Sequence, residues 1–169
     1  MRHVVVIPRL VVVALLALTA LMPAASVGAA PGQAQSVAGS GWRGTVTHPT
    51  TPITHFVVSA RNGPGGVSGT YSSMNPNNAL LNFSGRVTCL YVVGNQAIVG
   101  GLVTSGGAPG QIGTGFAVGF VDNASPTADA VTFSDVEIAR PVVCAAETFL
   151  FTLTNFPVLN GNLVLGTSS

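Results

Sequence analysis

The chain has 169 residues and few charges, with six Lys and Arg residues, five Asp and Glu residues and 47% hydrophobic residues. All six basic residues are arginines, and they are scattered, so no basic patch is available for a phosphate backbone or an anionic lipid surface. The composition therefore excludes nucleic acid as an expected partner.

The first residues have the layout of an export signal. Arg2 and Arg9 precede an apolar run over 10–21, and small residues follow Pro23 as far as Ala30. The run is too short for a spanning helix, which needs about 20 residues. We expect a signal peptide over 1–29, cut between Ala29 and Ala30, and a cut after Ala34 is the alternative. The mature chain is then secreted and extracellular, with no stable insertion into a membrane.

Residues 30–40 are rich in Gly, Ala, Gln and Ser, and this composition predicts a flexible linker. Beyond it, apolar residues recur with period two and turn residues are frequent, which predicts strands. The expected strands cover 42–47, 54–61, 67–74, 80–93, 96–104, 113–122, 130–139 and 147–154, with a short closing strand over 162–166. Residues 41–169 are therefore predicted to form one all-β domain. A single antiparallel meander barrel of about eight strands is favoured, and a two-sheet β-sandwich is the alternative.

The two cysteines, Cys89 and Cys144, are expected to form a disulfide, because an even number of cysteines in an exported chain favours pairing. Alternation along 80–93 places Cys89 and Tyr91 on the same apolar face as Phe83 and Val87. In the expected strand over 113–122, the large residues at 116, 118 and 120 share one face. The small residues at 117 and 119 leave room for close packing on the other face.

Four segments together resemble the post-COAP β-domain of bacterial secreted proteins. They read VGNQAIVGG at 93–101, GFAVGFVDN at 115–123, ADAVTF at 128–133 and LNGNLVL at 159–165. The likeness covers roughly 67–166 and departs from the family pattern at Ala124, at Ala128 and around 141–146. These are turn and strand motifs, so the resemblance implies a β-domain. The family has no established activity, and it implies no catalytic residue.

Two groups of residues are candidates for binding. Asp122, Asn123 and Asp129 surround one turn and offer the oxygen ligands that calcium prefers, although Asx-type capping of the turn is the alternative explanation. Trp42 and His55 are candidate ligand-binding residues at the barrel mouth or edge. Trp42 would stack on a sugar ring if exposed, or would plug one end of the barrel. No cofactor is expected.

The sequence predicts a non-catalytic secreted domain, either an envelope-associated or a ligand-binding accessory protein. One alternative is a carrier of a small hydrophobic ligand with a lipocalin-like cavity. The other is a secreted hydrolase of unrecognised type, for which Asp135 and Glu137 offer paired carboxylates on one strand face. The expected partner is a small ligand or a component of the cell envelope. A hollow interior would favour the carrier, and a filled interior with an aromatic surface strip would favour the accessory protein.

Overall fold

The computed structural model describes residues 34–44, 47–48, 50–123, 125, 127–132, 135–138, 141–153 and 155–168, with the backbone alone for 135–138 and 168. The expected signal peptide and its cleavage site at Ala29 and Ala30 lie outside the described residues.

The described residues form ten strands in one antiparallel sheet. They are β1 (Ala34–Arg43), β2 (Thr54–Gly63), β3 (Gly66–Met74), β4 (Phe83–Val93), β5 (Gln96–Gly106), β6 (Gly115–Val121), β7 (Ala130–Val131), β8 (Asp135–Ile138), β9 (Phe156–Pro157) and β10 (Leu159–Ser168). Three short 3-10 segments join them, η1 (Ala79–Leu81), η2 (Cys144–Ala146) and η3 (Thr148–Thr152).

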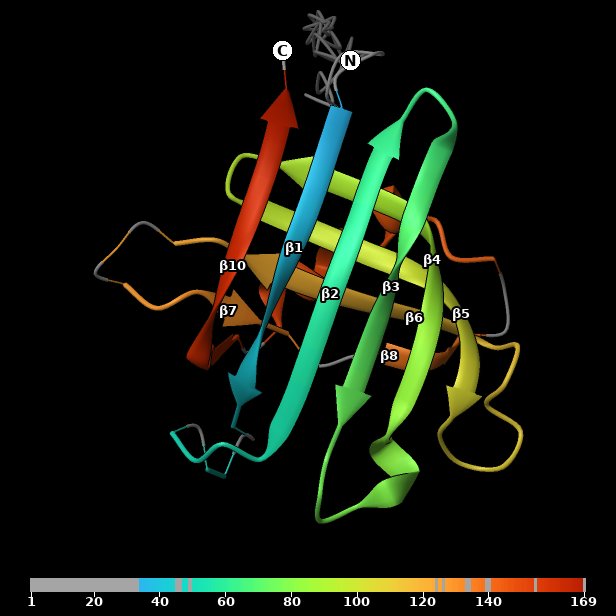
Figure 1. The fold of residues 1–169 in the computed structure, drawn as a ribbon, viewed down its shortest axis with the longest axis vertical. Helices are drawn as coiled ribbons and strands as arrows, with labels where there is room; N and C mark the ends of the chain where they lie inside the picture. The colour runs from blue at the N-terminus through green and yellow to red at the C-terminus, as the bar shows by residue number, and fades with distance from the viewer. Residues whose placement is uncertain are drawn as a thin grey trace, which may run out of the picture.

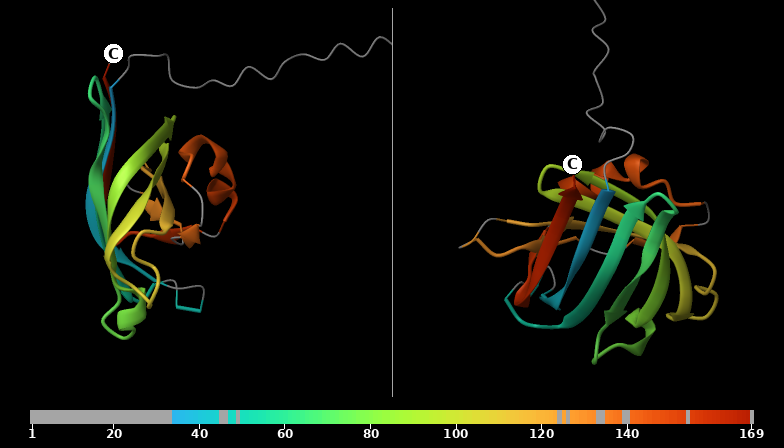
Figure 2. Two further views of the ribbon diagram at one scale, coloured as in Figure 1. Left: turned by 90° about the vertical axis from the view of Figure 1, so that its right-hand side faces the viewer. Right: turned by 45° about the horizontal axis from the view of Figure 1, so that its top comes forward.

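The sheet is a meander that returns to its first strand. Strands β1 to β7 are neighbours in sequence order, β8 pairs with β6, and β10 pairs with β1. Strand β9 pairs with β7, and Val158 alone separates it from β10, so the chain itself nearly closes the sheet. The predicted antiparallel barrel is confirmed. It is flattened into a front layer of β10, β1, β2 and β3 and a back layer of β4, β5 and β6, whose strands cross at a steep angle (Figure 1; Figure 2, left).

Strands β4 and β5 bend from the front of the barrel to the back. The pairing of β4 with β5 shifts register between Val87 and Cys89 and again between Ser84 and Gly85. Gly101 lies at this corner, where a Cβ atom would collide with the Arg86 carbonyl oxygen of the neighbouring strand. A bulge and a glycine are what a tightly bent antiparallel pair requires.

The interior between the layers is filled by large side chains. The Tyr71 ring is fully buried and stacks on Phe116, with their centroids 5.5 Å apart and their planes 24° apart. It also contacts Phe83 and Phe120. The predicted inward face of Phe116, Val118 and Phe120 is confirmed, because all three belong to this main core.

The predicted face of Cys89 and Tyr91 is wrong. Because the register shift after Val87 reverses the alternation, Leu90 and Val92 point into the main core instead. Cys89 and Tyr91 pack on the opposite side of the sheet, in a second apolar cluster. A single extra residue in a strand moves every later side chain to the other face.

That second cluster is covered by residues 141–153, here called the strap, which lies on the outside of the back layer (Figure 2, left). The predicted strand over 147–154 is wrong, since the strap consists of η2 and η3. In a 3-10 segment residues three apart share one side, and Glu147 and Leu150 are accordingly buried while Phe149 is 46% exposed.

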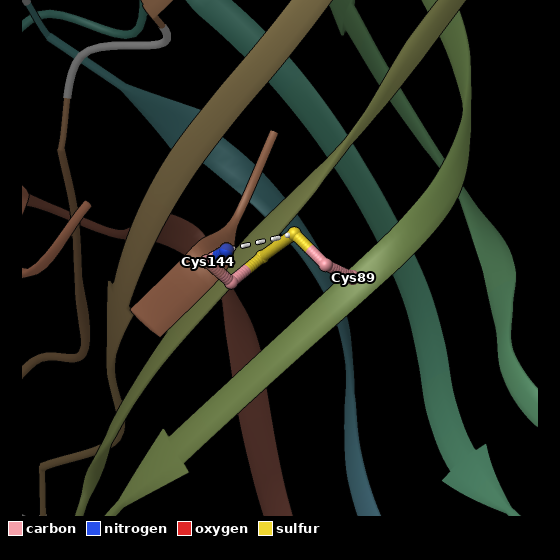
Figure 3. The surroundings of a disulfide bond; sticks show 2 residues. All are labelled: Cys89 and Cys144. Carbon is pink, nitrogen blue, oxygen red and sulfur yellow. Dashed lines mark hydrogen bonds between the residues drawn. A yellow bond between two sulfur atoms is a disulfide. The ribbon is translucent and has the colours of Figure 1, made fainter. Parts of the chain in front are cut away.

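The predicted disulfide is confirmed and holds the strap to β4. Cys89 and Cys144 are bonded, with Cα atoms 5.7 Å apart, and the Cys144 N–H donates a hydrogen bond to the Cys89 sulfur (Figure 3). The disulfide therefore joins the barrel wall to the segment that covers it.

Two further boundaries differ from expectation. The linker predicted over 30–40 is wrong from Ala34 onward, since these residues belong to β1, and residues 35–40 pair on both sides. Their small size permits close packing, as at Gly39, where a Cβ atom would collide with the Asn162 carbonyl oxygen of β10. The strand predicted over 130–139 is divided into β7 and β8. Between them Thr132 accepts a hydrogen bond from the Gly119 N–H at 2.8 Å. Gly119 is one of the two small residues that are expected to permit close packing.

Candidate functional site

The two predicted ligand-binding residues lie side by side. Trp42 near the end of β1 is directly opposite His55 near the start of β2. Their ring centroids are 5.1 Å apart and their planes are inclined at 58°. Both side chains are partly exposed, whereas the neighbouring pair, Arg43 and Thr54, is buried on the inner face of the sheet. Trp42 therefore does not plug the barrel but lies on its outer surface.

The same row continues on the strands to either side. Leu159 on β10 is opposite Trp42, and Met74 on β3 is opposite His55. Directly opposite residues in an antiparallel sheet share a face. Leu159, Trp42, His55 and Met74 thus form a continuous row across four strands, here called the aromatic strip. Met74 is 51% exposed and the other members are partly exposed.

A buried polar pair supports the strip from within. The Arg43 guanidinium lies over the Phe156 ring, 5.6 Å from its centroid. Burial lowers the pKa of Arg43 below its usual value, while the nearby Tyr71 hydroxyl acts in the opposite direction. Thr54 accepts a hydrogen bond from the Asn75 amide at 3.4 Å, which ties β2 to the segment after Met74. The strip is therefore built on packed elements.

A second feature lies at the other end of the same strands. A pocket of about 640 Å³ is lined by the start of β1, the β2–β3 turn and the end of β10. Its lining is mostly small and polar, and Arg61 is its charged member. The Arg61 side chain is exposed, and it points to the same side of β2 as His55, because six residues separate them in an alternating strand. The pocket shares no residue with the aromatic strip and lies near the opposite end of β2.

The predicted calcium ligands have a visible structural role. The Asp129 carboxylate accepts hydrogen bonds from the Leu163 and Asn123 N–H groups at 2.7 and 2.9 Å. The Asp122 carboxylate accepts one from the Leu165 N–H at 3.0 Å. These contacts satisfy the edge of β10 that faces away from β1, so two side chains complete the closure of the barrel.

Among the residues that the structure describes, no group of three or more His, Cys, Asp and Glu side chains is placed to hold a metal ion. Calcium binding at the turn stays a prediction, and the ion would compete with the backbone donors just described. Asp135 and Glu137 lie on β8, with side chains outside the described part. The paired-carboxylate hypothesis stays a prediction.

The sequence indicated Trp42 and His55 singly, but not their pairing or the contribution of Leu159 and Met74. These depend on the register of four strands. The sequence analysis also did not single out Arg61, which lines the pocket. The available signal was its position two residues beyond Ser59 and six beyond His55, on the polar face of an alternating strand.

Comparisons with protein-family models, with curated proteins and with solved structures found no match to this chain. The resemblance to the post-COAP β-domain accordingly stays a prediction. Within the described part of the chain, no helix is both long and apolar enough to cross a bilayer.

Proposed function

We propose that this chain is a non-catalytic, exported β-barrel domain that binds a glycan of the cell envelope through the aromatic strip. The observation that carries the proposal is the contact between Trp42 and His55 on the outer surface of a barrel whose interior is filled. Ring faces that are open to solvent bind the apolar faces of sugar rings, while nearby hydroxyl groups bond the sugar's edges.

The filled interior favours this proposal over the carrier of a small hydrophobic ligand. Tyr71, Phe56, Phe116 and Phe120 are fully buried where an enclosed ligand would lie. The predicted export signal and the disulfide support a role outside the cytoplasm.

The test is co-sedimentation of the mature chain with insoluble cell-wall sacculi, chitin and cellulose. The wild-type chain is expected to sediment with at least one of these polymers, without release of reducing sugar. Trp42→Ala is expected to weaken binding about tenfold, since loss of one stacked ring costs about 1.4 kcal/mol. The matched control is Phe149→Ala, which removes an exposed ring from the strap on the far side of the barrel. Equal binding by Trp42→Ala and the wild type, or no binding to any polymer, would overturn the proposal.

A further inference from the structure

We propose that the outer surface of the front layer binds a linear acidic polysaccharide along a path from the aromatic strip to the Arg61 pocket, with carboxylates of the sugars paired to Arg61 and Arg86. This inference rests on the proposed function and adds the class of glycan and its path. The surface is the side of β1, β2 and β3 turned away from the back layer, and it continues onto the start of β4, where Arg86 pairs with β3 (Figure 1; Figure 2, left).

The side chains between the aromatic strip and the Arg61 pocket are small, and most of them carry a hydroxyl group. Its outward side chains are exposed or partly exposed, and they are Ser36, Ala38 and Ser40 on β1, Val57, Ser59 and Arg61 on β2, and Ser68, Thr70 and Ser72 on β3. We call these residues the hydroxyl face. Short hydroxyl side chains let a polymer approach the sheet closely, and they both donate and accept hydrogen bonds.

The exposed charged side chains of this surface are arginines, and they favour an acidic ligand. Among the side chains that the structure describes, Arg61 and Arg86 are the exposed charged groups. The described carboxylates point elsewhere, since Asp129 and Glu147 are buried and Asp122 accepts a backbone hydrogen bond. A surface with unopposed guanidinium groups attracts anions, and a guanidinium matches a carboxylate in a two-pronged hydrogen bond.

The two arginines lie on either side of β3. Arg61 on β2 is opposite Ser68, and Arg86 on β4 is opposite Thr70, two residues further along β3. Two hydroxyl groups therefore lie between the two guanidinium groups, with no described carboxylate among them. This arrangement suits a polymer that alternates hydroxyl and carboxylate groups.

The length of the face suits a polymer and not a single sugar. Six residues of extended strand separate His55 from Arg61, which corresponds to about 20 Å, or several linked sugar rings. The pocket of about 640 Å³ at the Arg61 end has the volume of a site for a small molecule, and so would take one acidic ring of the chain.

Other polyanions fit the surface less well. Nucleic acid and anionic membranes are bound through many phosphate contacts, whereas the described residues of this face present two guanidinium groups. An acidic peptide would satisfy the arginines but would leave the stacking surface of Trp42 unused. A polysaccharide with carboxylated rings uses both.

The experiment exploits the single tryptophan of the chain, Trp42, whose fluorescence reports directly on the aromatic strip. The mature chain is titrated with a long oligogalacturonate, with its carboxyl-reduced counterpart, with a galacturonate disaccharide and with polyglutamate. The long acidic oligosaccharide is expected to bind most tightly, and its affinity is expected to fall as salt is added.

Arg61→Gln and Arg86→Gln are each expected to weaken binding of the long oligogalacturonate about threefold, and the double variant about tenfold, as for exposed ion pairs. The disaccharide is too short to span the distance of about 20 Å between His55 and Arg61, and it is expected to bind the wild type far more weakly than the long oligogalacturonate does. Arg61→Lys retains the charge and should recover part of the loss. Both arginines are exposed, and unchanged circular dichroism would show that the variants are folded.

Each other outcome has a defined meaning. If the carboxyl-reduced polymer binds as tightly as the acidic one, or if the arginine variants bind normally, the acidic path is wrong while the proposed function stands. If polyglutamate binds as tightly, the surface recognises charge alone and the inference fails. If no glycan changes the fluorescence of Trp42 or sediments with the chain, the proposed function fails as well.

Discussion

The outer faces of the two layers of the barrel differ in solvent exposure. Every residue of β6 in the back layer is buried, because one face meets the main core and the other meets the strap. Strand β2 in the front layer alternates instead between buried and exposed or partly exposed residues from Thr54 to Arg61. Among the described residues, the strap and its disulfide cover the outer face of the back layer, whereas the outer face of the front layer, here called the open face, is exposed to solvent. The proposed glycan binds on the open face.

The largest expected effect comes from removing the tether of the covered face. Replacing both Cys89 and Cys144 with Ala should lower the free energy of unfolding by about 4 kcal/mol, the loop-closure value for a closed loop of this length. Urea denaturation measures the loss. Trp42 fluorescence in native buffer should remain that of the wild type, because Trp42 lies on the other layer. A loss below about 1 kcal/mol would show that the strap holds without its tether.

The packing of the strap can be tested separately from the tether. Leu150 is fully buried against the back layer, so Leu150→Ala should cost about 3 kcal/mol in unfolding free energy. Leu153, on the same strap but 40% exposed, is the matched control and should cost less than about 1 kcal/mol when changed to Ala. Similar losses for the two variants would mean that the strap is not packed as described.

A smaller effect is expected where the two layers meet at β10. Asp129→Asn replaces a carboxylate that accepts two backbone hydrogen bonds in a buried site, and should cost about 2 kcal/mol. Asp122→Asn affects one such bond at a partly exposed site, and should cost about 1 kcal/mol. Thermal unfolding of both variants measures the difference. An Asp122 variant that is the less stable of the two would contradict this account of barrel closure.

Much of the barrel could be predicted from the sequence because period-two alternation is a local signal. The faces of Phe116 and Phe120 were found in this way, and so was the pair of strands expected over 80–93 and 96–104. The failures arose where a non-local contact overrode the local pattern. The shift after Val87 is fixed by pairing with β5, and the strap is not a strand because its disulfide and Leu150 hold it across the sheet.

The candidate site was predictable in part for the same reason. Trp42 and His55 stood out by residue type, as an aromatic ring beside a linker and a histidine at the start of a strand. Their contact needs the pairing of β1 with β2, and the place of Leu159 needs the return of the chain from the far end of the barrel. The small residues before Trp42 suggested a linker because composition does not report pairing partners.

The smallest expected effect on stability comes from exposed residues of the front layer. It tests most directly whether this face is exposed while the outer face of the back layer is covered. Val57 is 42% exposed on β2, and Val164 is 56% exposed on β10. Changing either to Thr keeps a β-branched side chain in a strand, so the free energy of unfolding should change by no more than about 0.5 kcal/mol. The double variant should show the sum of the two changes. A loss above about 1 kcal/mol that grows with protein concentration would mean that a second copy of the chain covers this face, and the face would then be closed to a polysaccharide.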